Sequence, residues 1–284
     1  MAQLKYKFKS DILFKILFTR YPNLLHSLVA ATLVVPMGSI ENIDVKNPEL
    51  TPEEVSGKFC RLDLNMMVDG KQVDLEIQRG DEGNYKERAA YYGSRLLSSS
   101  LGVGGDYGAI TRTILVSILD FILFDSPELS SSFALLERSR FELLTDRLEL
   151  IFLELPKLPD SVNIEDMRQV WMKVLKADTE EDFAELERME IPEVEQAVSA
   201  YKTITATPEY QELERVREKA RRDEANALSV AEKRGEARGE ARGEARGEAR
   251  GEARGETRMK EKTLKVLQGK GLSAEQISSI MEDL

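Results

Sequence analysis

Hydrophobic and polar positions alternate with a period of two across residues 61–78, RLDLNMMVDGKQVDLEIQ. This period places alternate side chains on opposite sides of a β-strand. Asp69-Gly70, between the two arms, suits a two-residue hairpin loop because both residues tolerate positive φ angles. The stretch therefore predicts a β-hairpin. Its apolar side has Leu62, Leu64, Met66, Val68, Val73, Leu75 and Ile77, and its polar side has Arg61, Asp63, Asn65, Gln72, Asp74, Glu76 and Gln78.

The loop also predicts the register of the hairpin. If Val68 faces Lys71, the pairing counted outward sets Asp63 directly opposite Glu76. Facing residues have Cβ atoms about 4.5–5.5 Å apart, so two carboxylates there repel each other unless a cation lies between them. Mg²⁺ meets that need, because it prefers a few carboxylate oxygens together with water and phosphate. The ordinary alternative is a solvated polar face that binds nothing.

Other patterns predict an α/β arrangement with helices at both ends. We expect Ser10 to cap a first helix and Pro22 to lie in the first turn of a second. From Asp160 onward the spacing is helical, and Trp171 is expected in the core. Helices are predicted within 10–18, 21–35, 84–100, 165–177, 180–190 and 192–204, and strands within 40–50, 61–78, 109–124 and 141–155.

Composition limits the classes of protein that remain. The 284 residues, 42% hydrophobic and 32% charged, are enough for one sizeable α/β core with helical additions. Cys60 is the only cysteine, which excludes an internal disulfide and suits a reducing cytoplasm; in a predicted strand it is expected to be inert. His26 is the only histidine, which excludes a histidine-rich zinc site. No apolar run is long enough to span a membrane, so we expect a cytoplasmic protein.

Charge divides the chain unevenly. The net charge of −11 argues at first against nucleic-acid binding. The excess acid, however, lies mostly between residues 126 and 207, where eighteen acidic residues accompany nine basic ones. We predict four parts: a core over 1–158, an acidic helical region over 159–207, a charged helical or spacer segment over 208–258, and a short helical module over 259–284 that serves interaction.

The charged segment carries a four-residue repeat, five GEAR units and one GETR, from Gly235 to Arg258. Each interior glycine costs about 1 kcal/mol relative to alanine, so an isolated helix here should be marginal. The repeat has no apolar stripe and is not a coiled-coil seam. It is either a solvated spacer or an arginine-bearing arm that touches DNA phosphate. After it we expect a helix, a glycine turn and a second short helix capped by Ser273.

Two helices add charged side chains that could converge on the hairpin. Asp11 and Lys15 share a face with Phe14 and Phe18, and Arg88 shares a face with Tyr85 and Tyr92. Packing alone explains both patterns, as a helix ion pair beside core aromatics and as a snorkelling arginine. The alternative is that Arg88 binds a phosphate, held by its aromatic neighbours.

The segments SDILFKILF, LDLNMMVDGKQVDLEIQ and YKERAAYYGSRL resemble the bacterial recombination-promoting nuclease and putative transposase family, a branch of the PD-(D/E)XK nucleases. The resemblance covers about residues 8–125. It implies an α/β, PD-(D/E)XK restriction-endonuclease-like core, a mixed central sheet flanked by helices, with an all-α C-terminal extension. It also implies that Asp63 and Glu76 bind Mg²⁺, or Mn²⁺ as a substitute. Gln78 stands where a lysine is usual, and glutamine cannot act as a charged electrophile or a base.

The resemblance implies a metal-dependent DNA endonuclease linked to recombination, mobile elements or phage defence. Asp63, Glu76 and Gln78 would be catalytic, and Asp11 is a candidate further metal ligand. Lys15, Arg88, Tyr85 and Tyr92 would contact DNA phosphate. The family's tails imply a homodimer formed partly by the C-terminal helices. Two alternatives stay open: a weak or inactive DNA-binding or assembly protein with the nuclease fold, and a structural protein that acts through its charged tail.

Overall fold

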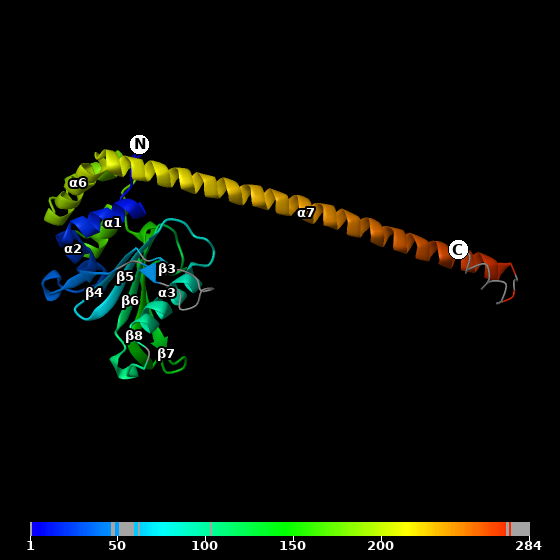
Figure 1. Ribbon diagram of the computed structural model, residues 1–284, viewed down its shortest axis with the longest axis horizontal. Helices are drawn as coiled ribbons and strands as arrows, with labels where there is room; N and C mark the ends of the chain where they lie inside the picture. The colour runs from blue at the N-terminus through cyan, green and yellow to red at the C-terminus, as the bar shows by residue number, and fades with distance from the viewer. Residues whose placement is uncertain are drawn as a thin grey trace. The chain divides into compact units, whose positions relative to one another are not determined.

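The computed structural model describes residues 2–46, 49–50, 60–61, 63–102, 104–270 and 273. The chain forms two compact units, Met1–Glu214 and Arg215–Leu284. The first holds every described strand and the helices around them (Figure 1). The second continues the last helix. The finer division into four parts, made from composition, stays a prediction.

A six-stranded mixed sheet forms the centre of the first unit, in the order β1-β4-β5-β6-β8-β7. β5, β6 and β8 are parallel, whereas β1, β4 and β7 pair antiparallel with their neighbours. This mixed sheet with flanking helices confirms the predicted fold class. The strands are β1 (Ile43–Val45), β4 (Leu64–Val68), β5 (Lys71–Gln78), β6 (Thr113–Leu119), β7 (Ser130–Leu136) and β8 (Leu143–Glu154), with β2 (Glu49–Leu50) and β3 (Cys60–Arg61) in a separate pair.

The hairpin of β4 and β5 has the predicted loop and register. Val68 pairs with Lys71, and the pairing continues to Leu64 opposite Leu75. Asp69 and Gly70 have φ angles of 45° and 77°, the left-handed region that a tight two-residue loop requires. The Asp69 carboxylate also accepts hydrogen bonds from the backbone N–H groups of Glu41 and Asn42, which fixes the loop against the preceding chain.

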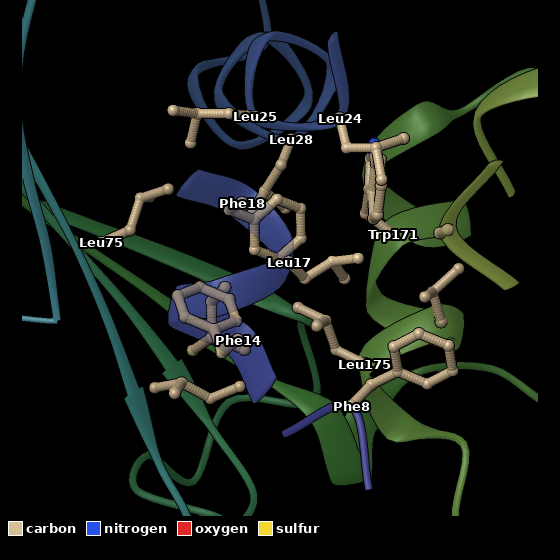
Figure 2. Close-up of a cluster of buried hydrophobic side chains, with 14 of the residues drawn as sticks. Phe8, Phe14, Leu17, Phe18, Leu24, Leu25, Leu28, Leu75, Trp171 and Leu175 are labelled. Atoms are coloured by element: carbon tan, nitrogen blue, oxygen red, sulfur yellow. The ribbon is translucent and has the colours of Figure 1, made fainter. Parts of the chain in front are cut away.

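Helices cover the two faces of the sheet unequally. One face packs against α1, α2 and α4–α6, and its core holds the apolar side of the hairpin. α1 lies inside this layer: Phe14 and Phe18 lie between the sheet and the side chains of α2 and α4 (Figure 2). The helices are α1 (Asp11–Arg20), α2 (Pro22–Leu33), α3 (Tyr85–Ser99), α4 (Met167–Lys176), α5 (Glu180–Glu187), α6 (Pro192–Thr205) and α7 (Pro208–Gly269), with short 3-10 turns at Met37–Ser39, Tyr107–Ala109 and Leu155–Lys157.

Among the described helices, α3 packs on the other face, close to the strands. Tyr85, Ala89 and Leu96 pack against the β6 and β8 side chains of that face. Gly93 makes the close approach possible, because a Cβ atom there would lie 2.7 Å from Leu150 Cδ2. The polar side of the hairpin is therefore not a solvated surface. Asn65, Asp74 and Glu76 on that side are all buried.

Two other features differ from the sequence patterns. β7 was not predicted, because it is an edge strand whose Phe133, Leu135 and Leu136 are all exposed and do not alternate. Ser10 precedes α1 as predicted, but its side chain does not cap the helix. Its hydroxyl instead donates to the Glu214 carboxylate, which also accepts from Tyr210 in the first turns of α7.

The C-terminal region is helical, as predicted. α7 is continuous from Pro208 to Gly269 and includes the whole GEAR repeat, whose residues with a described burial are exposed. The choice between spacer and arginine-bearing arm stays open. The second short helix predicted after Ser273 lies outside the described residues.

Trp171 offers a test of the helical layer, because its ring is fully buried against Phe18 and its indole N–H donates to Ser27 Oγ at 2.9 Å. We expect Trp171→Ala to lower the free energy of unfolding by about 3–5 kcal/mol, since it leaves a cavity and an unpaired hydroxyl. Ile164→Ala, at a position that is 59% exposed, should change it by less than about 0.5 kcal/mol. Denaturant unfolding measures both. Equal changes in the free energy of unfolding for the two variants would contradict the packing described.

Candidate active site

Asp63 and Glu76 face each other at the end of the hairpin, as the register predicted. The Asp63 N–H donates to Glu76 Oε1 at 3.1 Å, and Asp63 Oδ2 accepts from the Ile77 N–H at 3.0 Å. Each carboxylate thus binds the backbone of the opposite strand. These reciprocal bonds hold both side chains at the end of the sheet, just beyond the last strand pair of the hairpin, Leu64 with Leu75.

Asp74 lies on the same side of β5 as Glu76, two residues earlier, and its side chain is completely buried. The two carboxyl groups are hydrogen-bonded to each other, and among the described residues no backbone N–H or basic side chain donates to Asp74. Burial, with the nearby negative charge of Asp63, raises the pKa of Glu76 from 4.5 to about 8. Burial and the charge of Glu76 also raise the pKa of Asp74 well above its usual range.

Lys15 provides a cation on the Asp63 side of this group. It projects from α1, and its Nζ lies 3.0 Å from Asp63 Oδ1. The start of α1 is held at the same end of the sheet by the buried Lys9, which forms an ion pair of 2.7 Å with Asp120. Asp120 in turn donates its backbone N–H to the carbonyl oxygen of Gln78, so α1 and β5 are joined through β6.

Arg88 provides a second cation, on the Gln78 side. Its Nη2 donates to Gln78 Oε1 at 2.6 Å, and Nη1 lies 3.5 Å from the exposed carboxylate of Glu82. The guanidinium also lies against the Tyr85 ring, 4.8 Å from its centroid, and 5.9 Å from that of Tyr92. The positive charge of Arg88 acts on Glu76 and partly opposes the rise in its pKa.

The structure therefore gathers most of the predicted residues from three elements. Asp63, Glu76 and Gln78 come from the hairpin, Lys15 from α1, and Tyr85, Arg88 and Tyr92 from α3. Asp11 lies one turn before Lys15 on α1, and its place as a metal ligand stays a prediction. The sequence interpretation did not single out Asp74. The only sequence signal for Asp74 was its position on the same side of the hairpin as Glu76, and no local pattern showed that α3 would bury that side.

The donor groups fit a hard divalent cation bound by few protein ligands. Among the described residues, no three His, Cys, Asp or Glu side chains are arranged so as to hold a metal by themselves. Mg²⁺, however, usually takes one or two carboxylates and completes its coordination with water and phosphate. Asp63 and Glu76 can supply those two carboxylates. The contact of Asp74 with Glu76, and the negative charges of Glu76 and Asp63 that act on it, indicate an excess of acidic groups at the same place.

The model of one protein family, described as PD-(D/E)XK nuclease family transposase, matches residues 8–231. The chain belongs to this family. Comparisons with curated proteins and with solved structures give no match. The match includes the hairpin, α1 and α3, so all residues of the candidate site lie within the PD-(D/E)XK nuclease region. Membership supports a nuclease-like or transposase-related function. Within the described residues, no helix combines the length and apolar character needed to cross a membrane.

The raised pKa of Glu76 predicts how stability depends on pH. Unfolded Glu76 loses its proton near pH 4.5, whereas the folded side chain keeps it until about pH 8. The native state thus holds more protons between these values, so stability should fall as pH rises from 4.5 to 8 and then level off. Thermal unfolding in EDTA measures this slope. Glu76→Gln should reduce this slope, with the remainder due to Asp74, and an unchanged slope in that variant would contradict the assignment.

Proposed function

We propose that the protein is a metal-dependent DNA endonuclease that hydrolyses phosphodiester bonds, with Asp63 and Glu76 as the ligands of Mg²⁺. The observation that carries the proposal is the facing carboxylate pair, held by reciprocal backbone bonds and flanked by two cationic side chains. Membership of the PD-(D/E)XK nuclease family supports the reaction class. A role in recombination, mobile elements or phage defence agrees with the family's description as a transposase.

Each side chain has a distinct task in this proposal. A bound Mg²⁺ would supply Lewis-acid polarisation of the phosphate and a water of lowered pKa. Asp63 and Glu76 hold the cation, and their backbone bonds fix their direction at the sheet end. Lys15, partly exposed beside Asp63, offers an ammonium to a phosphate oxygen. The arrangement places positive charge around the position where negative charge develops in phosphoryl transfer.

Gln78 acts through its amide in the proposed site. Its Oε1 accepts from Arg88, and its Nε2 donates to the Gly80 carbonyl oxygen at 3.0 Å. An amide oxygen has a second lone pair and an amide nitrogen a second hydrogen, so each atom keeps capacity for water or phosphate. Gln78 therefore orients the guanidinium of Arg88, which can bind a phosphate in its fork geometry. Tyr85 and Tyr92 support the guanidinium on its flat side.

The second candidate is a DNA-binding or assembly protein that keeps the fold but has little activity. The neutral Gln78 favours it, because neither a base nor a charged electrophile stands at that position. A metal-binding measurement distinguishes the endonuclease from the DNA-binding or assembly protein, because an inactive protein has no need of the destabilising Asp63–Glu76 pair. In either case we expect a cytoplasmic homo-oligomer assembled through its C-terminal helices.

Nicking of supercoiled plasmid in Mg²⁺, Mn²⁺ or EDTA tests the proposal. We expect the native chain to cut only with metal. Glu76→Ala and Asp63→Asn should each reduce the rate at least about 100-fold, since each removes a metal ligand. Asp146→Asn, an exposed acid away from the hairpin, is the matched control and should cut normally. All variants should keep their circular-dichroism spectra. Metal-independent cutting, or full activity in Glu76→Ala, would contradict the proposal.

A further inference from the structure

Asp74 is an unusual side chain for the interior of this protein. Its exposed fraction is 0%, and among the described residues neither of its carboxylate oxygens accepts a hydrogen bond from a backbone N–H or a basic side chain; its partner is the carboxyl group of Glu76. The only other fully buried carboxylate of the core, Glu154, is fully paired in the described structure. It binds Lys157 Nζ at 2.6 Å and accepts from the backbone N–H groups of Leu123 and Phe124.

Burial without a cationic partner makes Asp74 a cost to stability. A buried polar group is unfavourable unless it is hydrogen-bonded, and a buried charge needs a partner of opposite sign. The neighbours of Asp74 increase the cost, because Glu76 and Asp63 both act on it with negative charge. Lys15 acts on Asp74 with positive charge, but the ion pair that Lys15 forms is with Asp63. Packing therefore gives no reason for a carboxylate at this position.

The surrounding charges give a reason for a carboxylate at position 74. Three carboxyl groups, Asp63, Asp74 and Glu76, share one end of the sheet, and Lys15 and Arg88 flank them. Arg88 contacts both Gln78 and Glu82, so part of its positive charge is already compensated by the Glu82 carboxylate. A divalent cation at Asp63 and Glu76 would supply the missing positive charge. In a buried site that attraction is weakly screened and acts over several ångströms without direct contact.

We propose that Asp74 is a third functional carboxylate of this site: a positioning residue, placed behind Glu76, that strengthens the binding of Mg²⁺ or Mn²⁺ at Asp63 and Glu76. The inference rests on the proposed metal site. Asp74 acts in two ways. It adds negative charge next to the ligands, and its contact with the Glu76 carboxyl group holds that side chain beside Asp63. The protein keeps a buried acid that no cationic side chain neutralises because the bound cation offsets its cost.

Titration of the full-length protein with Mn²⁺ by calorimetry, with thermal unfolding in EDTA, tests this role without reference to cleavage. Asp74→Asn replaces the carboxylate with a neutral group of the same shape. We expect it to weaken Mn²⁺ binding at least about tenfold while the metal-free protein unfolds at the native temperature or above. Glu154→Gln is the matched control, a buried and fully paired carboxylate. It should lower the unfolding temperature and leave the Mn²⁺ affinity unchanged.

The outcomes separate this inference from the proposed function. If native protein and Asp74→Asn bind Mn²⁺ equally, the inference is wrong and the metal site stands. If Asp74→Asn unfolds earlier and binds Mn²⁺ normally, Asp74 is structural and the inference is also wrong. If the native protein neither binds Mn²⁺ nor cuts plasmid, the proposed function fails, and the inference with it. Weaker binding in a variant of native or higher stability supports the inference.

Discussion

Repulsion among Asp63, Asp74 and Glu76 is the interaction on which the rest of the site depends. Taking carboxylates out of water is expensive, and placing them together is more so. Part of this cost is offset by the positive charges of Lys15 and Arg88 and by the backbone N–H groups that bind Asp63 and Glu76. The remaining part is visible as the raised pKa of Glu76 and as the buried Asp74, whose carboxyl group contacts another acid. Such unresolved cost is typical of functional sites rather than of structural ion pairs.

Secondary structure outside the site keeps these groups in place. The tight loop at Asp69-Gly70 sets the register, and the register sets which acids face each other. α1 lies deep in the apolar layer, which fixes the backbone of Lys15 at the sheet end (Figure 2). α3 approaches closely through Gly93 and both buries the polar side of the hairpin and carries Arg88 to Gln78. A rigid scaffold of this kind suits a reaction that depends on position and charge.

The hairpin could be predicted from the sequence because its signals are local: a period of two and a loop dipeptide. Burial of its polar side could not, since it depends on α3, which follows in sequence but packs across β6 and β8. For the same reason Asp74 looked like one more polar-face residue. Helical spacing indicated that Lys15 and Arg88 could converge on the acids, and the family resemblance supplied the roles expected of them. β7 was missed because an exposed edge strand has no buried face to impose alternation.

The most direct measurement of the central claim is anomalous diffraction from crystals of the full-length protein grown with Mn²⁺. The account predicts a manganese peak within bonding distance of the carboxylates of Asp63 and Glu76. It also predicts that the ion pair between Lys15 Nζ and Asp63 Oδ1, 3.0 Å apart here, is broken in those crystals. Manganese bound elsewhere, with the Lys15–Asp63 ion pair intact and no peak at the hairpin, would contradict it.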